Sequence, residues 1–252
     1  MTTDTRERDI VRSFIAFSDS LVDDFDVLDV VTRLAEDCAR LLDVAAAGLL
    51  LADARGELHL LAATSEQARS LEVFQLQRDE GPCLDCYHNG EPVSVADLST
   101  ETARWPRFVA AASRRGFASV HAIPMRLRKR TLGALGLFGT TPGDLGAEDL
   151  SLAQALAHVA TIAILQEHRA TGNAAITSRL QSAVASRAVV ETAKGVLAEV
   201  YEIDTDEAFK RLRRYAREHD QHLAEVAGAA VSGPSAIRKA LLGELQGGHA
   251  AE

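Results

Sequence analysis

Residues 186–231 read SRAVVETAKGVLAEVYEIDTDEAFKRLRRYAREHDQHLAEVAGAAV and contain three helical patterns with clear boundaries. Apolar residues recur at three- and four-residue steps in 186–201, again after Asp204, and again in 222–231, which predicts three amphipathic helices. Asp204 followed by Glu207 is a candidate capping box for the second helix. Short amphipathic helices bury their apolar faces by packing on one another. We therefore predict an all-α three-helix bundle in this part of the chain.

The basic charge of the second helix is local. The chain has 27 Lys and Arg against 36 Asp and Glu, a net charge of −9, yet five cations and no acid stand in 210–217: Lys210, Arg211, Arg213, Arg214 and Arg217. Helical spacing predicts that four of them form one outward ridge, able to reach the phosphates of a nucleic acid: Lys210, Arg213, Arg214 and Arg217. The alternative is an ordinary solvated helix face. Charge alone favours that alternative, because six acids between Glu191 and Glu207 partly offset the cations.

Three motifs in this region keep a common order and spacing: Arg187-x-x-x-Glu191-x-Ala193-Lys194-Gly195-x-Leu197, Glu207-Ala208-Phe209-x-x-Leu212-Arg213 and Leu223-x-x-Val226-Ala227. Together they resemble the ANTAR domain, an RNA-binding three-helix module of bacterial transcription antitermination regulators. The resemblance implies that the bundle binds hairpins in nascent transcripts and prevents termination, usually as a homodimer.

The same resemblance implies roles for single residues. Lys194 and Gly195 match an Ala-Lys-Gly element of the family, and Arg187 and Arg213 match its cationic positions. With the ridge, the predicted RNA-binding residues are Arg187, Lys194, Gly195, Lys210, Arg213, Arg214 and Arg217. The sequence departs from the family pattern at Thr192, where Gln is usual, and at Asp220 and His222, where Asn and Lys are frequent. The last two leave open whether the turn before the third helix touches RNA.

The composition of the 252 residues is that of an ordinary globular protein. No run approaches the roughly 18 apolar residues that cross a bilayer, and the N-terminus has no apolar signal core. We therefore expect a cytoplasmic protein without a membrane partner. Three cysteines, Cys38, Cys83 and Cys86, are expected to be thiols, since a long chain without a secretion signal seldom carries a disulfide framework.

The preceding residues predict an α+β domain. Helices are expected over 6–21 and 27–42, and Cys38 on the second is expected to be a small core residue. Hairpins are expected from the apolar runs 45–52 with 57–63 and 119–127 with 131–139, with a third strand at 93–96. Short helices are expected at 65–74, 83–89 and 105–116, so that an antiparallel sheet is covered by helices on one or both faces. From Glu148 to Tyr201 a long helix with an apolar seam is predicted as a coiled coil, with a kink or a break left open at 171–173.

Four segments carry a second resemblance: Glu80-Gly81-Pro82-Cys83-Leu84-Asp85, Glu91 to Leu98, Arg104-Trp105-Pro106-Arg107-Phe108, and Thr131 to Phe138. They resemble a GAF domain, and more narrowly the one that precedes ANTAR in many actinobacterial regulators. The resemblance implies a sensory module that holds a small-molecule effector between the sheet and its short helices. The implied ligand pocket is bordered by Cys83, Tyr87, Trp105, Phe108 and His121. A lone Trp beside a Phe is nevertheless more often plain core.

Other chemistry has weaker support in the sequence. The C-x-x-C of Cys83 and Cys86 lacks a second ligand pair at zinc spacing, so no metal is expected. Cys83 at a helix start could have a lowered pKa and respond to oxidation. Some GAF proteins resemble thiol reductases of free methionine sulfoxide, which is one alternative function. A dimeric protein-interaction scaffold without RNA binding is the other.

These observations predict a non-enzymatic, ligand- or redox-responsive antitermination regulator. The expected organisation is an N-terminal helix at 1–25, a GAF sensor at 26–168, a helical linker at 169–185, an ANTAR domain at 186–233 and a C-terminal extension at 234–252.

Overall fold

The computed structural model describes residues 3–19, 27–53, 55–128, 130–166, 173–219 and 221–232. The chain divides into two compact units, Met1–Gln181 and Ser182–Glu252, which are described separately. The predicted C-terminal extension and the tripeptide in which a helix break was left open fall wholly or partly outside the described residues.

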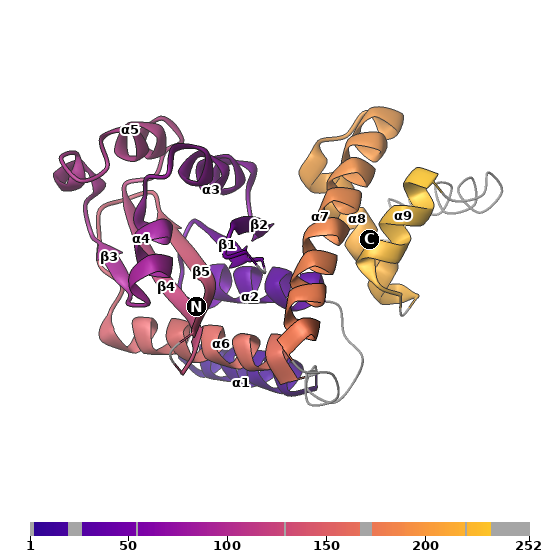
Figure 1. The fold of residues 1–252 in the computed structure, drawn as a ribbon, viewed down its shortest axis with the longest axis horizontal. Helices are drawn as coiled ribbons and strands as arrows, with labels where there is room; N and C mark the ends of the chain where they lie inside the picture. The colour runs from indigo at the N-terminus through magenta and orange to yellow at the C-terminus, as the bar shows by residue number, and fades with distance from the viewer. Residues whose placement is uncertain are drawn as a thin grey trace. The chain divides into compact units, whose positions relative to one another are not determined.

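The first unit is organised around a five-stranded antiparallel sheet with the strand order β2-β1-β5-β4-β3. Both hairpins predicted from the sequence are present, and the central strand β5 of the second hairpin pairs with β1 of the first (Figure 1). The strands are β1 (Ala46–Ala52), β2 (Leu58–Ala63), β3 (Val93–Val95), β4 (Ser119–Leu127) and β5 (Arg130–Gly139).

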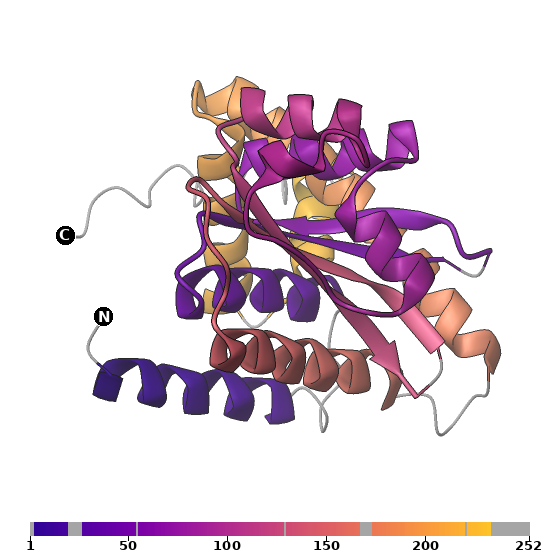
Figure 2. The same ribbon diagram turned by 90° about the vertical axis from the view of Figure 1, so that its left-hand side faces the viewer.

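Helices cover both faces of this sheet (Figure 2). One face carries α2 (Val27–Leu41) and α6 (Ala147–Gln166), and α1 (Thr3–Asp19) packs on these two helices. The other face carries α3 (Glu66–Arg78), α4 (Pro82–Asn89) and α5 (Pro106–Arg114), preceded by the short 3-10 helix η1 (Leu98–Glu101). All seven residues of β1 are buried, as expected for a strand covered on both sides.

Local sequence explains where several helices begin and end. The Ser65 hydroxyl accepts a hydrogen bond from the Ala68 N–H and caps α3. Pro82 opens α4, and Gly90 closes it in the left-handed conformation at φ 68°. Cys38 is fully buried on α2 and acts as the small core residue that the sequence predicts.

Helix α6 corrects the expectation that no segment is apolar and long enough to span a bilayer. Its residues 147–165 have a mean hydropathy of 1.2, which meets that test by length and composition. The helix packs on β4 and α2, buries Leu156, Ala160 and Ile164, and is tied to α1 by an ion pair between Asp149 and Arg6. Its apolar character is therefore that of a core helix.

The second unit is a bundle of α7 (Asn173–Tyr201), α8 (Thr205–Glu218) and α9 (Leu223–Ser232). Its core is built from apolar side chains of all three helices, among them Val190, Leu197, Leu212, Leu223 and Val226. The Asp204 carboxylate accepts a hydrogen bond of 2.7 Å from the Glu207 N–H, so the predicted N-cap of the second helix is present. The three helices of the sequence prediction are confirmed.

Gly136 tests how closely the first sheet is packed. A Cβ at this position would lie 2.5 Å from Glu72 Oε1 and 2.8 Å from Cys83 Sγ. Gly136→Ala should therefore lower the free energy of unfolding of the first unit by about 1–3 kcal/mol through overpacking. Urea unfolding followed by the fluorescence of Trp105, the single tryptophan, measures this unit selectively. Gly143→Ala, where a Cβ meets nothing within 4 Å, is the control and should change the stability little.

Candidate functional site

Two cations of α7, Arg187 and Lys194, share one carboxylate. Glu191 Oε1 lies 2.5 Å from Arg187 Nη2 and 3.3 Å from Lys194 Nζ. The Lys194 ammonium also lies 5.5 Å from the centre of the Phe209 ring on α8, a cation–π contact. Arg187 and Lys194 are only 8% and 5% exposed. Both predicted RNA-binding cations are thus largely withdrawn from solvent, and Lys194 contributes to the packing of α7 on α8.

The cations of α8 do not form the uniform exposed ridge that the spacing predicts. Lys210 is exposed and Arg214 is half-buried, but Arg213 is buried at 8% exposure. The side chain of Arg217 lies outside the described residues. The reason is the width of the buried face: α8 buries not only Ala208, Leu212 and Ala216 but also positions 211 and 213 on either side of Leu212.

Helix geometry identifies the outward side of α8. At about 100° per residue, positions 210 and 214 lie about 40° apart and directly opposite Leu212, which is fully buried. Arg211 is tied to the helix itself, since its Nε donates to Glu207 Oε1 at 2.9 Å. Lys210 and Arg214 are thus the predicted phosphate-binding residues that the described structure presents to solvent.

Gly195 lies on an open face of α7. A Cβ there would meet nothing within 4 Å, and Gly195 is exposed. Exposed residues recur along this helix at three- and four-residue steps: Ala185, Ala188, Val189, Thr192, Gly195, Glu199 and Val200. We call these residues the α7 outer stripe. Small and apolar side chains dominate it, although it faces solvent.

The predicted ligand pocket of the first unit is not assembled as expected. Trp105 and Phe108 form an edge-to-face pair at 6.2 Å and are buried in an apolar cluster with Leu71 and Phe138, so the Trp is plain core. Tyr87 lies elsewhere, where its hydroxyl donates to the Gly56 carbonyl of the β1–β2 turn at 3.3 Å.

His121 lies on the opposite face of the sheet from Cys83. Val120 and Ala122 belong to the clusters under α3, α4 and α5, so alternation along β4 points His121 towards the face that carries α2 and α6. Its ring is 2% exposed, and Nδ1 has no hydrogen-bond partner among the described residues. Burial lowers the pKa of His121. The structure therefore does not bring His121 together with the other predicted pocket residues.

A buried polar cluster that sequence reasoning missed occupies the face beneath α3 and α4. Glu72 Oε2 accepts a hydrogen bond from Gln75 Nε2 at 2.7 Å, and Glu72 Oε1 lies 3.5 Å from the Cys83 thiol, which donates to it. Gln75 Oε1 accepts from the Cys83 N–H at 3.0 Å. Glycines make the room for these side chains: a Cβ at Gly48 or Gly136 would lie within 2.7 Å of the Glu72 carboxyl. Gly48 and Gly136 were the sequence signal for this buried cluster, but the sequence does not show which side chain fills the space beside them.

Burial dominates the titration of this cluster. Desolvation raises the pKa of Glu72 to about 8, so its carboxyl is largely protonated at neutral pH. Desolvation, and then the nearby Glu72, raise the pKa of Cys83 well above its usual value, and burial raises the pKa of Cys86 to about 12. The expectation that the helix start lowers the pKa of Cys83 is therefore wrong, because burial outweighs the helix terminus.

Glu72 should make the stability of the first unit pH-dependent. Above the usual pKa of 4.5 the unfolded chain releases a proton that folded Glu72 keeps, so stability falls as pH rises from about 4.5 to 8 and levels off beyond. Glu72→Gln mimics the protonated carboxyl and should remove this fall, which amounts to a few kcal/mol. Urea unfolding by Trp105 fluorescence between pH 5 and 9 measures it. An unchanged pH slope in the variant would contradict the assignment.

Within the described residues, Asp53, Glu57 and His59 offer ligand atoms within 4.8 Å of one another. Asp53 Oδ1 already accepts the N–H groups of Arg55 and Glu57 at 2.8 and 3.0 Å, and Oδ2 lies 3.3 Å from His59 Nε2. These contacts are those of an Asp side chain that organises a hairpin turn. The arrangement is explained without a metal.

Family models match both parts of the chain. A GAF domain model matches residues 26–165, and an ANTAR domain model matches residues 178–231. The chain belongs to the GAF domain family and carries an ANTAR domain, an RNA-binding antitermination module, behind its GAF sensor domain. No curated protein matches the chain.

Solved structures are similar to part of this chain at low sequence identity. The GAF domain of an Acinetobacter phosphoenolpyruvate-protein phosphotransferase is similar at 16% identity and a TM-score of 0.49, over 69% of this chain and 99% of that one. The free methionine-R-sulfoxide reductase of Neisseria meningitidis, solved with its substrate, is similar at 16% identity and a TM-score of 0.51, over 68% of this chain and 96% of that one. At such identities the likeness shows the fold alone.

Proposed function

We propose that this chain is a ligand-responsive transcription antitermination regulator of the actinobacterial type, in which the GAF domain controls an ANTAR domain that binds hairpins in nascent mRNA. It acts in the cytoplasm, where transcripts are made, and has no enzymatic role. The proposed boundaries are those of the sequence analysis, with the GAF sensor at 26–168 and the ANTAR domain at 186–233.

The observation that supports RNA binding best is the outward position of Lys210 and Arg214 on α8. These two cations face away from the bundle core, whereas Arg187 and Lys194 are held by Glu191. A chain with a net charge of −9 repels nucleic acid as a whole, so binding depends on such local groups and on the shape of a folded RNA. Lys194 then supports the interface through its contact with Phe209 of α8, Arg187 through its ion pair with Glu191, and Gly195 by leaving the α7 surface open.

The buried thiols favour a ligand over oxidation as the input. A thiol reacts with oxidants as the thiolate, and burial raises the pKa values of Cys83 and Cys86. The same argument weakens the thiol-reductase alternative, since the likeness to the Neisseria enzyme is one of fold. We infer that ligand binding shifts the populations of two GAF conformations, and that the helices leading to the bundle transmit the change.

Lys210→Ala with Arg214→Ala should weaken the binding of a hairpin RNA and make the remaining binding less dependent on salt. Each lost phosphate contact should lower the slope of log K against log salt by about 0.7–0.9. Filter binding or fluorescence anisotropy at salt concentrations of about 50 to 300 mM measures both the affinity for the hairpin RNA and its dependence on salt.

The matched control removes two exposed cations from the GAF domain, Arg107→Ala with Arg114→Ala, and changes the net charge equally. Equal loss of affinity in both double variants would mean that net charge, not the outward side of α8, governs binding. Recovery of proteins but no hairpin-bearing transcripts in an RNA pull-down would favour the scaffold alternative.

The α7 outer stripe supports a homodimer through a coiled coil. Its positions follow alternating steps of three and four residues, which is the spacing of a helix-pairing seam, and Val189 and Val200 are 37% and 54% exposed. We expect Thr192→Arg at the centre of the stripe to shift the protein from dimer to monomer in sedimentation at micromolar concentration. Thr102→Arg, an exposed site in the GAF domain, is the control. A wild-type protein that sediments as a monomer with and without RNA would contradict the dimer.

A further inference from the structure

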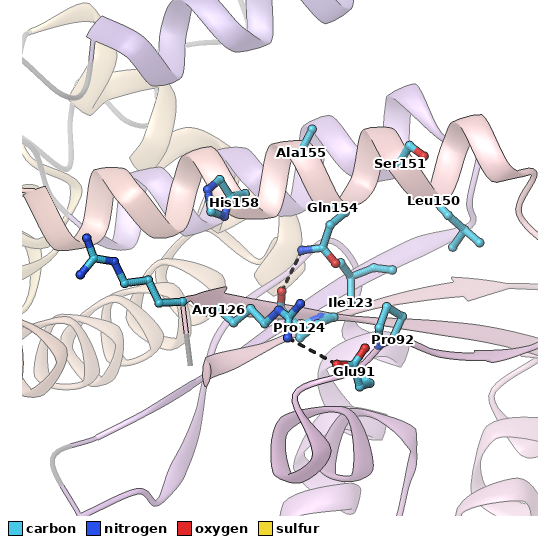
Figure 3. A pocket seen from close by; sticks show the side chains of 11 residues that line it. Glu91, Pro92, Ile123, Pro124, Arg126, Leu150, Ser151, Gln154, Ala155 and His158 are labelled. Carbon is cyan, nitrogen blue, oxygen red and sulfur yellow. Dashed lines mark hydrogen bonds and ion pairs between the residues drawn. The ribbon is translucent and has the colours of Figure 1, made fainter. Parts of the chain in front are cut away.

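We propose that the groove between β4 and α6 of the GAF domain binds a small organic anion. The groove has a volume of about 830 Å³ and lies at the edge of the sheet where β3 begins, on the side of α6 (Figure 3). It is separate from the buried Glu72 cluster, which lies on the face that carries α3 and α4. The residues that shape its chemistry are Glu91, Ile123, Arg126, Arg128, Gln154 and His158.

The short third strand creates the groove. β3 pairs with β4 only at positions 120–122, whereas β4 continues to Leu127. Beyond β3, the edge of β4 contains Pro124, which has no backbone N–H that would need a hydrogen-bond partner. The Pro124 carbonyl accepts a hydrogen bond of 3.2 Å from Gln154 Nε2 of α6. The edge is thus satisfied by the helix without a further strand, and the space beside it remains open (Figure 3).

Two arginines face one acid on the walls. Arg126 lies near the end of β4 and Arg128 in the turn that follows it, against Glu91, and α6 adds the imidazole of His158. The Arg126–Glu91 pair is loose: the closest atoms are 3.4 Å apart, and the side chains are 47% and 68% exposed. Such an exposed pair contributes little stability, so an anion that enters the groove can replace Glu91 as the partner of Arg126.

The lining of the groove is largely apolar. Pro92, Ile123, Leu150 and Ala155 contribute to it, and the volume is within the range of small-molecule sites. Apolar side chains together with guanidinium groups suit a ligand with a compact apolar body and one oxyanion, which an arginine can bind through two parallel hydrogen bonds. The oxyanion could be a carboxylate or a phosphate, and both are tested below.

Occupation of this groove would link β4 to α6. A ligand held by Arg126 on the strand and by Gln154 or His158 on the helix stabilises their packing. Helix α6 is the last element of the sensor before the chain continues to α7. The groove is therefore placed to report binding along the chain, although the binding itself does not depend on the RNA-binding function.

Four probes test the proposal on the full-length protein: phenyl phosphate, benzoate, inorganic phosphate and the uncharged benzyl alcohol. We expect phenyl phosphate or benzoate, or both, to bind in isothermal titration calorimetry and to shift the amide NMR signals of 150–158 and 123–128. Benzyl alcohol should bind at least about tenfold more weakly, which is a difference in binding free energy of about 1.4 kcal/mol. The stronger of the two aromatic anions identifies the oxyanion. Any of three results would overturn the proposal. Benzyl alcohol binds as tightly as the aromatic anions, the NMR shifts are confined to other segments, or neither aromatic anion binds at about 10 mM, the limit of a useful weak site.

Variants make the test specific to the groove. Arg126→Gln should weaken the aromatic anion about tenfold, and Glu91→Gln should tighten it because a competing carboxylate is removed. Ala155→Leu should reduce the volume of the groove and weaken benzoate or phenyl phosphate more than inorganic phosphate. Arg107→Gln, an exposed cation on α5, is the control and should have no effect. If Arg126→Gln does not fold, Glu91→Gln decides, because unchanged or weaker binding in that surface variant would contradict the proposed competition.

Discussion

Coverage of the sheet on both faces is the constraint on which the sensor domain depends. Because α2 and α6 close one side and α3, α4 and α5 the other, strand residues and the helix residues beneath them lose contact with water. Any polar group left inside must be neutral or paired. Glu72 satisfies this condition as a protonated carboxyl bonded to Gln75 and Cys83, in space that Gly48 and Gly136 leave free. The same burial raises the pKa values of Cys83 and Cys86, which disfavours the thiolate form of both side chains.

The cations of the helical bundle fall into two groups, which differ in the side chains that surround them. Glu191 pairs with Arg187 and Lys194, and the Lys194 ammonium also contacts the Phe209 ring, so Lys194 contributes to the packing of α7 against α8. Lys210 and Arg214 lie opposite the buried Leu212 and remain directed to solvent. A positive charge in the bundle is therefore structural or available for binding according to its angle on the helix, even though neighbouring residues in the sequence look alike.

Local signals predicted the elements well and the tertiary neighbours poorly. Asp204 as an N-cap, Pro82 and Gly90 as the ends of α4, and both hairpins follow from chemistry within a few residues. The burial of Arg213 and the position of His121 depend on how wide a face each element buries, which periodicity does not give. The groove could not be predicted either, because its walls come from residues as far apart as Glu91 and His158. The sequence therefore predicts a candidate functional surface best where all of its residues lie on one helix.

The strand order also has a consequence for synthesis on the ribosome. The first hairpin, β1 with β2, emerges early, but its inner edge pairs with β5, which is the last strand of the sheet to be made. Until β5 arrives, β1 exposes unpaired backbone groups and the apolar run Leu49–Leu51, which is a surface prone to aggregation. Completion of the sensor thus waits for the β4–β5 hairpin, and α6 and the bundle follow directly behind it. A nascent chain of this protein should need a chaperone most while its first half is made and least once α6, which ends at Gln166, is free to cover the sheet.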